Sequence, residues 1–280
     1  MRMSVRASLP FRRGAALLLA ALPLGLVIPA PAAAGATLPA PPTVTMALDG
    51  QRVDMPDALR SSRYRFVLDG VGGVQLLKVA RGYTRAEFLR DVNLEAGGSV
   101  RASERLERNI RFFGGVFARH GERGVFWETL YSGTYWVIST RADLEQRSDI
   151  KVVTVSGAVR ATAWPGSTAT LTMAEDGVEA PAQLPRRGRL LVRNAGKMPD
   201  LFAVLRLAPG KTIEDLENWD PESDEEPIED VAVPVALLSG DTSMLWGYAM
   251  PRGSYVIMNM GSLWSDADSL RDVVAEIRVR

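Results

Sequence analysis

The chain has 280 residues, 46% of them apolar, so it can fill the cores of two domains of ordinary size. Its 33 basic and 33 acidic residues balance, so we expect neither nucleic acid nor an anionic membrane surface as a partner. The absence of cysteine and the single histidine, His120, exclude disulfides, thiolate metal sites, a cysteine nucleophile and multi-histidine metal sites.

The first 34 residues have the layout of a secretory signal peptide: a basic start, an apolar run and small residues at the end. The apolar run, Gly14–Ile28, is broken by Pro23 and is shorter than the roughly 20 residues that a membrane-spanning helix needs. The small-x-small pattern predicts cleavage after Ala34, with Ala32 and Ala36 as alternatives.

Residues 35–43 are proline-rich, and we expect them to form an extended lead-in to the folded part of the chain. No later stretch is long and apolar enough to span a membrane, so we expect the mature protein to be secreted. The pair Arg12-Arg13 leaves the export route open between general secretion and the twin-arginine route.

The rest of the chain falls into two halves that carry the same markers in the same order. Each half has two short strands, a helix that begins with a hydroxyl and a carboxylate three residues apart, a long connection and a late Gly-x-Tyr strand. The helix starts are Thr84–Glu87 and Thr212–Asp215, and the late strands begin at Gly133 and Gly253. Agreement over so many markers predicts an internal duplication.

Short strands that recur at intervals of about 8–12 residues, with turn signals between them, predict an antiparallel sandwich or barrel in each half. We place the boundary near Gly157, which gives domains at 44–157 and 158–280. A second helical stretch in the first half, Ser103–Asn109, leaves this class unchanged.

One stretch of the second half, Arg193–Leu201, reads R-N-A-G-K-M-P-D-L and resembles the cupredoxin family, in which a strand ends N-x-x-G-x-x-P-H and the histidine binds copper. In that family a late Gly-x-Tyr strand, to which Gly253-Ser-Tyr255 is similar, leads into a loop that holds a cysteine, a histidine and a methionine. The resemblance implies a Greek-key β-sandwich in each half. The fold class we expect is therefore all-β, with two tandem cupredoxin-like domains that each carry a short helix.

The copper ligands of that family are missing from this chain. Asp200 stands at the position of the first histidine, and Asn259 and, in the first half, Ser139 stand at the position of the cysteine. A blue-copper site needs a thiolate and two imidazoles, so we expect no metal and no cofactor. Met258 and Met260 alternate on one strand and form a weaker candidate site for Cu(I), with core packing as the alternative.

His120 is a candidate general base or metal ligand, with an exposed turn histidine as the alternative. It lies at the tip of an expected hairpin, and Glu122 is its only nearby carboxylate in the sequence. The acidic stretch 214–230 could hold calcium or form a solvated loop, and its counterpart in the first half, 101–111, is basic. These opposite charges suggest that the two connections pair, either between the two domains or between molecules as a route to self-association. Among six tryptophans, only Trp219 and Trp264 lie in loops where they could contact a sugar; Trp127, Trp136 and Trp246 lie in core-like runs.

The sequence therefore predicts a secreted, non-catalytic binding or structural protein, not an enzyme, that contacts an extracytoplasmic protein or a surface ligand. One alternative is a metal-handling or redox accessory protein with a weak methionine and carboxylate ion site. The other is a carbohydrate-binding protein.

Overall fold

The computed structural model describes residues 37–140, 150–175, 177–219, 226–231, 236–259 and 274–280. The predicted cleavage site at Ala34, Met260, Trp264 and the centre of the acidic stretch lie outside these ranges. None of the helices within them is long and apolar enough to cross a membrane.

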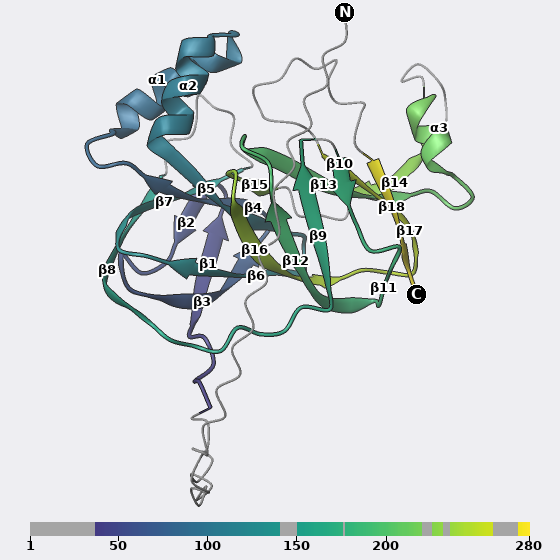
Figure 1. Ribbon diagram of the computed structural model, residues 1–280, viewed down its shortest axis with the longest axis horizontal. Helices are drawn as coiled ribbons and strands as arrows, with labels where there is room; N and C mark the ends of the chain where they lie inside the picture. The colour runs from purple at the N-terminus through teal and green to yellow at the C-terminus, as the bar shows by residue number, and fades with distance from the viewer. Residues whose placement is uncertain (1–36, 141–149, 176, 220–225, 232–235, 260–273) are drawn as a thin grey trace, which may run out of the picture. The chain divides into compact units, whose positions relative to one another are not determined.

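The first half contains eight strands and two helices (Figure 1). They are β1 (Thr43–Asp49), β2 (Arg52–Asp54), β3 (Ala58–Gly70), β4 (Gly72–Val79), α1 (Arg85–Ala96), α2 (Val100–Asn109), β5 (Ile110–Ala118), β6 (Arg123–Leu130), β7 (Gly133–Ser139) and β8 (Lys151–Arg160).

The second half contains ten strands and one helix within the described ranges. They are β9 (Ala169–Ala174), β10 (Gly177–Glu179), β11 (Gln183–Leu184), β12 (Arg187–Asn194), β13 (Asp200–Leu207), α3 (Ile213–Glu217), β14 (Ile228–Val231), β15 (Ala236–Leu238), β16 (Thr242–Ala249), β17 (Gly253–Asn259) and β18 (Val274–Val279).

The strands of the two halves pair in the same way. In the first half β1 runs parallel to β3, β3 is antiparallel to β6, and β4 is antiparallel to both β5 and β7. In the second half β9 runs parallel to β12, β12 is antiparallel to β16, and β13 is antiparallel to β14, β15 and β17. This pairing confirms the predicted all-β class with a Greek-key sandwich in each half.

Both predicted capping boxes are present. The Thr84 hydroxyl accepts from the Glu87 backbone N–H at the start of α1, and Thr212 does the same with Asp215 at the start of α3. The first half has a second helix, α2, which begins at Val100 rather than at the predicted Ser103.

The Gly-x-Tyr strand of each half places a tyrosine in the core. Tyr135 and Tyr255 are fully buried, and each phenol bonds the backbone four residues earlier. The Tyr131 backbone N–H donates to the Tyr135 hydroxyl at 3.1 Å, and the Tyr255 hydroxyl donates to the Pro251 carbonyl at 2.9 Å. These bonds satisfy the polar end of an otherwise apolar ring, as a buried tyrosine requires.

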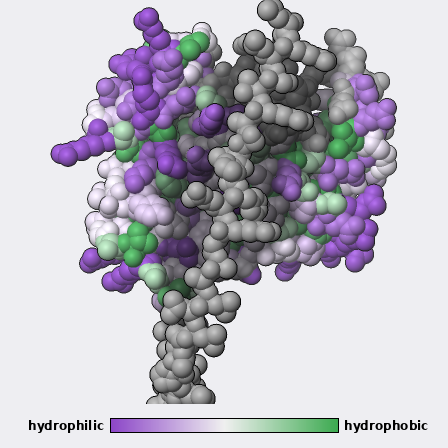
Figure 2. All heavy atoms as spheres, in the orientation of Figure 1, coloured by the Kyte–Doolittle hydropathy of each residue, from purple (hydrophilic) through white to green (hydrophobic). Residues whose placement is uncertain are grey.

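Helices α1 and α2 lie side by side against the outer face of β4 and β7 (Figure 1). Phe88, Val92 and Leu106 bury their side chains there beside Trp136, whose ring meets that of Phe88 edge-on at 5.5 Å. The solvent side of this helix pair is hydrophilic (Figure 2), as its arginine-rich sequence requires.

The halves are joined by strand pairing and by a buried amide. The pair Phe126–Trp246 lies at the centre of the antiparallel register between β6 and β16. The Gln75 side chain donates to the Leu237 carbonyl at 3.0 Å and accepts from the Leu237 backbone N–H at 2.9 Å. Residues of both halves contribute to one continuous apolar core, so the relative position of β4 and β15 is fixed by packing and by hydrogen bonds.

Candidate functional site at the junction of the two halves

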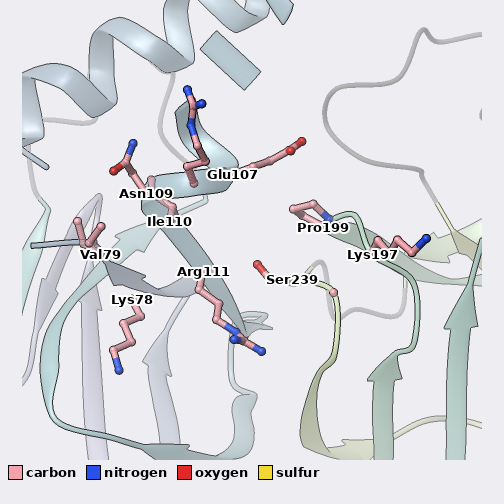
Figure 3. Close-up of a pocket in the computed structure, with 12 residues that line it drawn as sticks. Lys78, Val79, Glu107, Asn109, Ile110, Arg111, Lys197, Pro199 and Ser239 are labelled. Carbon is pink, nitrogen blue, oxygen red and sulfur yellow. The ribbon is translucent and has the colours of Figure 1, made fainter. Parts of the chain in front are cut away.

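A pocket of about 400 Å³ opens where the end of β4 and the start of β5 face two loops of the second half (Figure 3). We call it the junction pocket. Its walls are Lys78, Val79, Ala80, Glu107, Arg108, Asn109, Ile110, Arg111, Lys197, Pro199, Ser239 and Gly240.

Lys78 and Arg111 are neighbours on adjacent strands of this wall. The register of β4 places Lys78 opposite Arg111 of β5 on one side and opposite Tyr135 of β7 on the other. The Lys78 Nζ lies 5.6 Å from the centre of the Tyr135 ring and 6.0 Å from that of Tyr131. Partial burial, and secondly the charge of Arg111, hold the pKa of Lys78 below its ordinary value.

The glycine of the Gly-x-Tyr turn makes room for the Lys78 side chain. Gly133 has φ 145°, and a Cβ atom there would lie 2.9 Å from Cε of Lys78. A larger residue at position 133 would therefore push the lysine out of its place over the tyrosine rings.

In the second half, the cation at the position equivalent to Lys78 is paired with a carboxylate. Arg206 of β13 lies opposite Tyr255 of β17, as Lys78 lies opposite Tyr135. Arg206 forms an ion pair with Glu229, with 3.2 Å between Nη1 and Oε2. The corresponding neighbour of Lys78 is a second cation, so a contact that is attractive in one half is repulsive in the other.

The opposite wall is a loop held by Asn194, which ends β12. Its Nδ2 donates to the carbonyls of Met198 at 2.7 Å and Leu238 at 2.8 Å, and its Oδ1 accepts from the Gly196 backbone N–H at 2.9 Å. The Asn of the N-x-x-G-x-x-P pattern thus fixes the loop against β15. This arrangement brings Lys197 to the pocket.

The pocket carries an excess of positive charge. Four cations line it, against the single carboxylate of Glu107. Within the part of the chain that the structure describes, none of the four forms an ion pair. The Arg111 guanidinium makes a long 3.5 Å contact to the Asp241 carbonyl and lies 5.9 Å from the centre of the Phe113 ring. Burial, and secondly the charge of Glu104, raise the pKa of Glu107. Unpaired cations around a pocket can bind an anion.

The structure places two of the three residues at copper-ligand positions on neighbouring strands. Asp200 begins β13 and pairs with Leu238 of β15. Asn259 ends β17 and pairs with Phe202, which lies two residues after Asp200 on β13. Ser139 is buried at the end of β7 in the other half.

These residues do not fit a blue-copper centre. A carboxylate, an amide and a hydroxyl replace the imidazole and the thiolate, and the sequence has no cysteine to supply the sulfur ligand. No group of three histidine or acidic side chains in the described ranges could hold a metal ion. Met258 lies on β17 opposite Ala203, and its predicted companion Met260 lies outside those ranges.

The remaining sequence candidates lie apart from the junction pocket. His120 is exposed in the turn between β5 and β6, and Trp219 is half-buried after α3. Trp127, Trp136 and Trp246 are buried. The basic connection that we expected to pair with the acidic stretch is helix α2, where Arg105 bonds Asp91 of α1.

Sequence reasoning missed the junction pocket, although two signals for it were present. The sequence has four lysines, and two of them, Lys78 and Lys197, line the pocket. In addition, the repeat puts Arg111 where the second half has an acidic segment.

No protein-family model and no curated protein sequence matches the chain. Among solved structures it is similar to reduced auracyanin from Roseiflexus castenholzii, with 12% identity over 41% of this chain and 99% of that chain and a TM-score of 0.27. It is also similar to a copper-containing nitrite reductase from Thermus scotoductus, with 11% identity over 85% of this chain and 61% of that one and a TM-score of 0.26. A multicopper oxidase is similar at 11% identity over 85% of this chain and 88% of that one, with a TM-score of 0.25.

This comparison corrects the prediction that the protein is not an enzyme. The nitrite reductase and the multicopper oxidase are enzymes, and the similarity to each extends over 85% of this chain. The prediction was based on the lack of a recognisable catalytic motif, the absence of cysteine, the single histidine and the duplicated scaffold. A pocket built from two distant segments leaves no sequence motif. We draw no particular activity from these structures, because their TM-scores are low.

Proposed function

We propose that this chain is an exported ligand-binding protein made of two cupredoxin-like domains, 44–157 and 158–280, that arose by duplication. Its ligand is a small anion held in the junction pocket. Export is supported by the N-terminal residues, whose basic start, apolar run and small residues up to Ala34 fit a signal peptide. The absence of cysteine supports a role that does not use blue copper.

The observation that carries the proposal is the like-charge pair of Lys78 and Arg111. Like charges directly opposite each other on adjacent strands destabilise a sheet. The second half avoids this cost through Glu229, the acidic neighbour of Arg206. The Lys78–Arg111 pair lowers the stability of the free protein and lies in a pocket. A bound anion that neutralises both charges would explain why the pair is present.

The geometry also suits an anion of limited size. The pocket volume of about 400 Å³ falls in the usual range for small-molecule sites. Arg111 offers a planar guanidinium that can bind a carboxylate or phosphate through two parallel hydrogen bonds, and Lys197 offers a point charge from the opposite wall.

Thermal unfolding in the presence of different anions tests the proposal. Sulfate, phosphate and citrate should raise the melting temperature above that in chloride at equal ionic strength, because a ligand of the native state stabilises it. The rise should be smaller for Arg111→Gln. Arg101→Gln is the matched control, because Arg101 is an exposed arginine of α2 outside the pocket walls. An equal rise in all three proteins would refute a specific site.

A further inference from the structure

We propose that Lys78 is a reactive amine that forms an imine with the carbonyl group of a small anionic oxo acid or aldehyde bound in the junction pocket. This inference rests on the proposed anion site and adds a covalent step to it.

The surroundings of Lys78 favour the free amine. The side chain is half-buried and the neighbouring cation is Arg111, and both features act against the ammonium form. The two tyrosine rings near Nζ act in the opposite direction, as cation–π partners of the ammonium. No carboxylate within the described ranges forms an ion pair with it. A lysine that is partly withdrawn from water and lies next to another cation loses its proton more readily, and the unprotonated amine is the nucleophile. The lowered pKa of Lys78 agrees with this environment.

The other lysines differ from Lys78. Lys151 lies 2.6 Å from a carboxylate oxygen of Asp57, so its ammonium form is stabilised by an ion pair. Lys197 is exposed at the opposite wall of the pocket, and Lys211 lies outside the pocket walls. Only Lys78 combines partial burial, a neighbouring cation and a place in the pocket.

The same wall supplies an anchor for the anionic end of the ligand. Figure 3 shows that the side chains of Lys78 and Arg111 extend to the same side of their strands. A carboxylate bound by the Arg111 guanidinium would present an adjacent carbonyl carbon to the neighbouring amine. Such fixation raises the effective concentration of the carbonyl at the nucleophile.

The step needs no cofactor and no oxidant. The lone pair of Nζ attacks the carbonyl carbon to form a C–N bond, and the electron pair of the C–O π bond moves to oxygen, which takes a proton. The carbinolamine then loses its hydroxyl group and the remaining N–H hydrogen as water. The products are one imine and one water molecule.

The test is reductive trapping with glyoxylate, a small aldehyde that carries a carboxylate. The purified protein is incubated with glyoxylate and cyanoborohydride, and the adduct on each lysine is measured by peptide mass spectrometry. Lys78 should react on the order of tenfold faster than Lys211, because the bound carboxylate raises the local aldehyde concentration. Sulfate should suppress the reaction of Lys78 and leave that of Lys211 unchanged.

Three controls separate the possible failures. Formaldehyde has no carboxylate, so the preference for Lys78 should fall with it, and Lys78→Arg should remove the fast adduct while keeping the charge. If Lys78 reacts no faster than Lys211 while sulfate still binds to the protein, the covalent step is wrong and the anion site stands. If sulfate neither binds nor competes, the anion site itself is wrong.

Discussion

Lys78 and Arg111 face each other as register partners across β4 and β5 without an ion pair to a described carboxylate. In the second half the equivalent cation, Arg206, has a carboxylate neighbour at 3.2 Å. The two halves therefore allow a direct comparison of the same strand position, with a cation paired to a carboxylate in the second half and an unpaired cation in the first.

Arg111→Glu should convert the first half to the arrangement of the second. We expect the free energy of unfolding without added anion to rise by about 0.2–1 kcal/mol, because an attractive pair replaces a repulsive one. Denaturant unfolding in low salt measures this change. Arg101→Glu makes the same charge change on exposed α2, and an equal gain there would show that the effect of Arg111→Glu is a general one of net charge.

Asn194→Ala should release the loop that carries Lys197. The substitution removes three hydrogen bonds and leaves the Leu238 carbonyl without its side-chain donor, so we expect a loss of about 1–3 kcal/mol in unfolding free energy. Anion binding should weaken as well, because Lys197 loses its fixed position. Asn93→Ala, at an exposed position of α1, is the matched control and should change neither quantity. Unchanged anion affinity in Asn194→Ala would exclude a role of this loop in binding.

Asp91→Asn should destabilise the helix pair α1–α2. The Asp91 carboxylate is buried, and Arg105 donates to its Oδ1 from Nη2 at 2.8 Å, while the Tyr83 hydroxyl donates to Oδ2 at 3.0 Å. Hydrogen bonds from Arg105 first, and then from Arg90 and Tyr83, lower the pKa of Asp91 to about 2. We expect Asp91→Asn to cost about 2 kcal/mol at neutral pH.

The sign of the pH dependence follows from the lowered pKa of Asp91. Its contribution is fully present above the pKa of an unfolded aspartate, near about 4, and is lost as pH falls towards about 2. The stability difference between the wild type and Asp91→Asn should therefore shrink in that acid range. A difference that stays constant down to pH 2 would contradict the ion pairing of Asp91.

Glu128→Gln should make the protein more stable at neutral pH. Glu128 is buried, and its Oε1 accepts from the Thr129 backbone N–H at 2.7 Å. Among the described residues, its Oε2 has no hydrogen-bond partner. Burial raises the pKa of Glu128 well above its ordinary value, although the charges of Arg63 and Arg111 act in the opposite direction.

A raised carboxyl pKa means that the folded chain holds the proton more tightly than the unfolded chain. Wild-type stability should therefore fall from about pH 5 upward, and this fall should be absent in Glu128→Gln. Chemical denaturation at a series of pH values upward from the ordinary glutamate pKa of about 4.3 measures both profiles. Parallel profiles would show that the folded pKa is not raised.

The fold was predictable because its markers are local. A hydroxyl and a carboxylate three residues apart specify the helix starts at Thr84 and Thr212, and a turn glycine before a tyrosine specifies β7 and β17. The junction pocket was not predictable in this way. It depends on the register that places Lys78 beside Arg111 and on the packing that brings Lys197 to them from a loop more than a hundred residues away. The charges were visible in the sequence, but their proximity arises only from tertiary structure.

Isothermal titration of the purified protein with sulfate at low ionic strength tests the anion site most directly. We expect saturable binding with one site per chain, a loss of about tenfold or more in affinity for Arg111→Glu, and little change for Arg101→Glu. Wild-type protein that shows no saturable sulfate binding, or equal losses in the two variants, would contradict an anion site at Lys78 and Arg111.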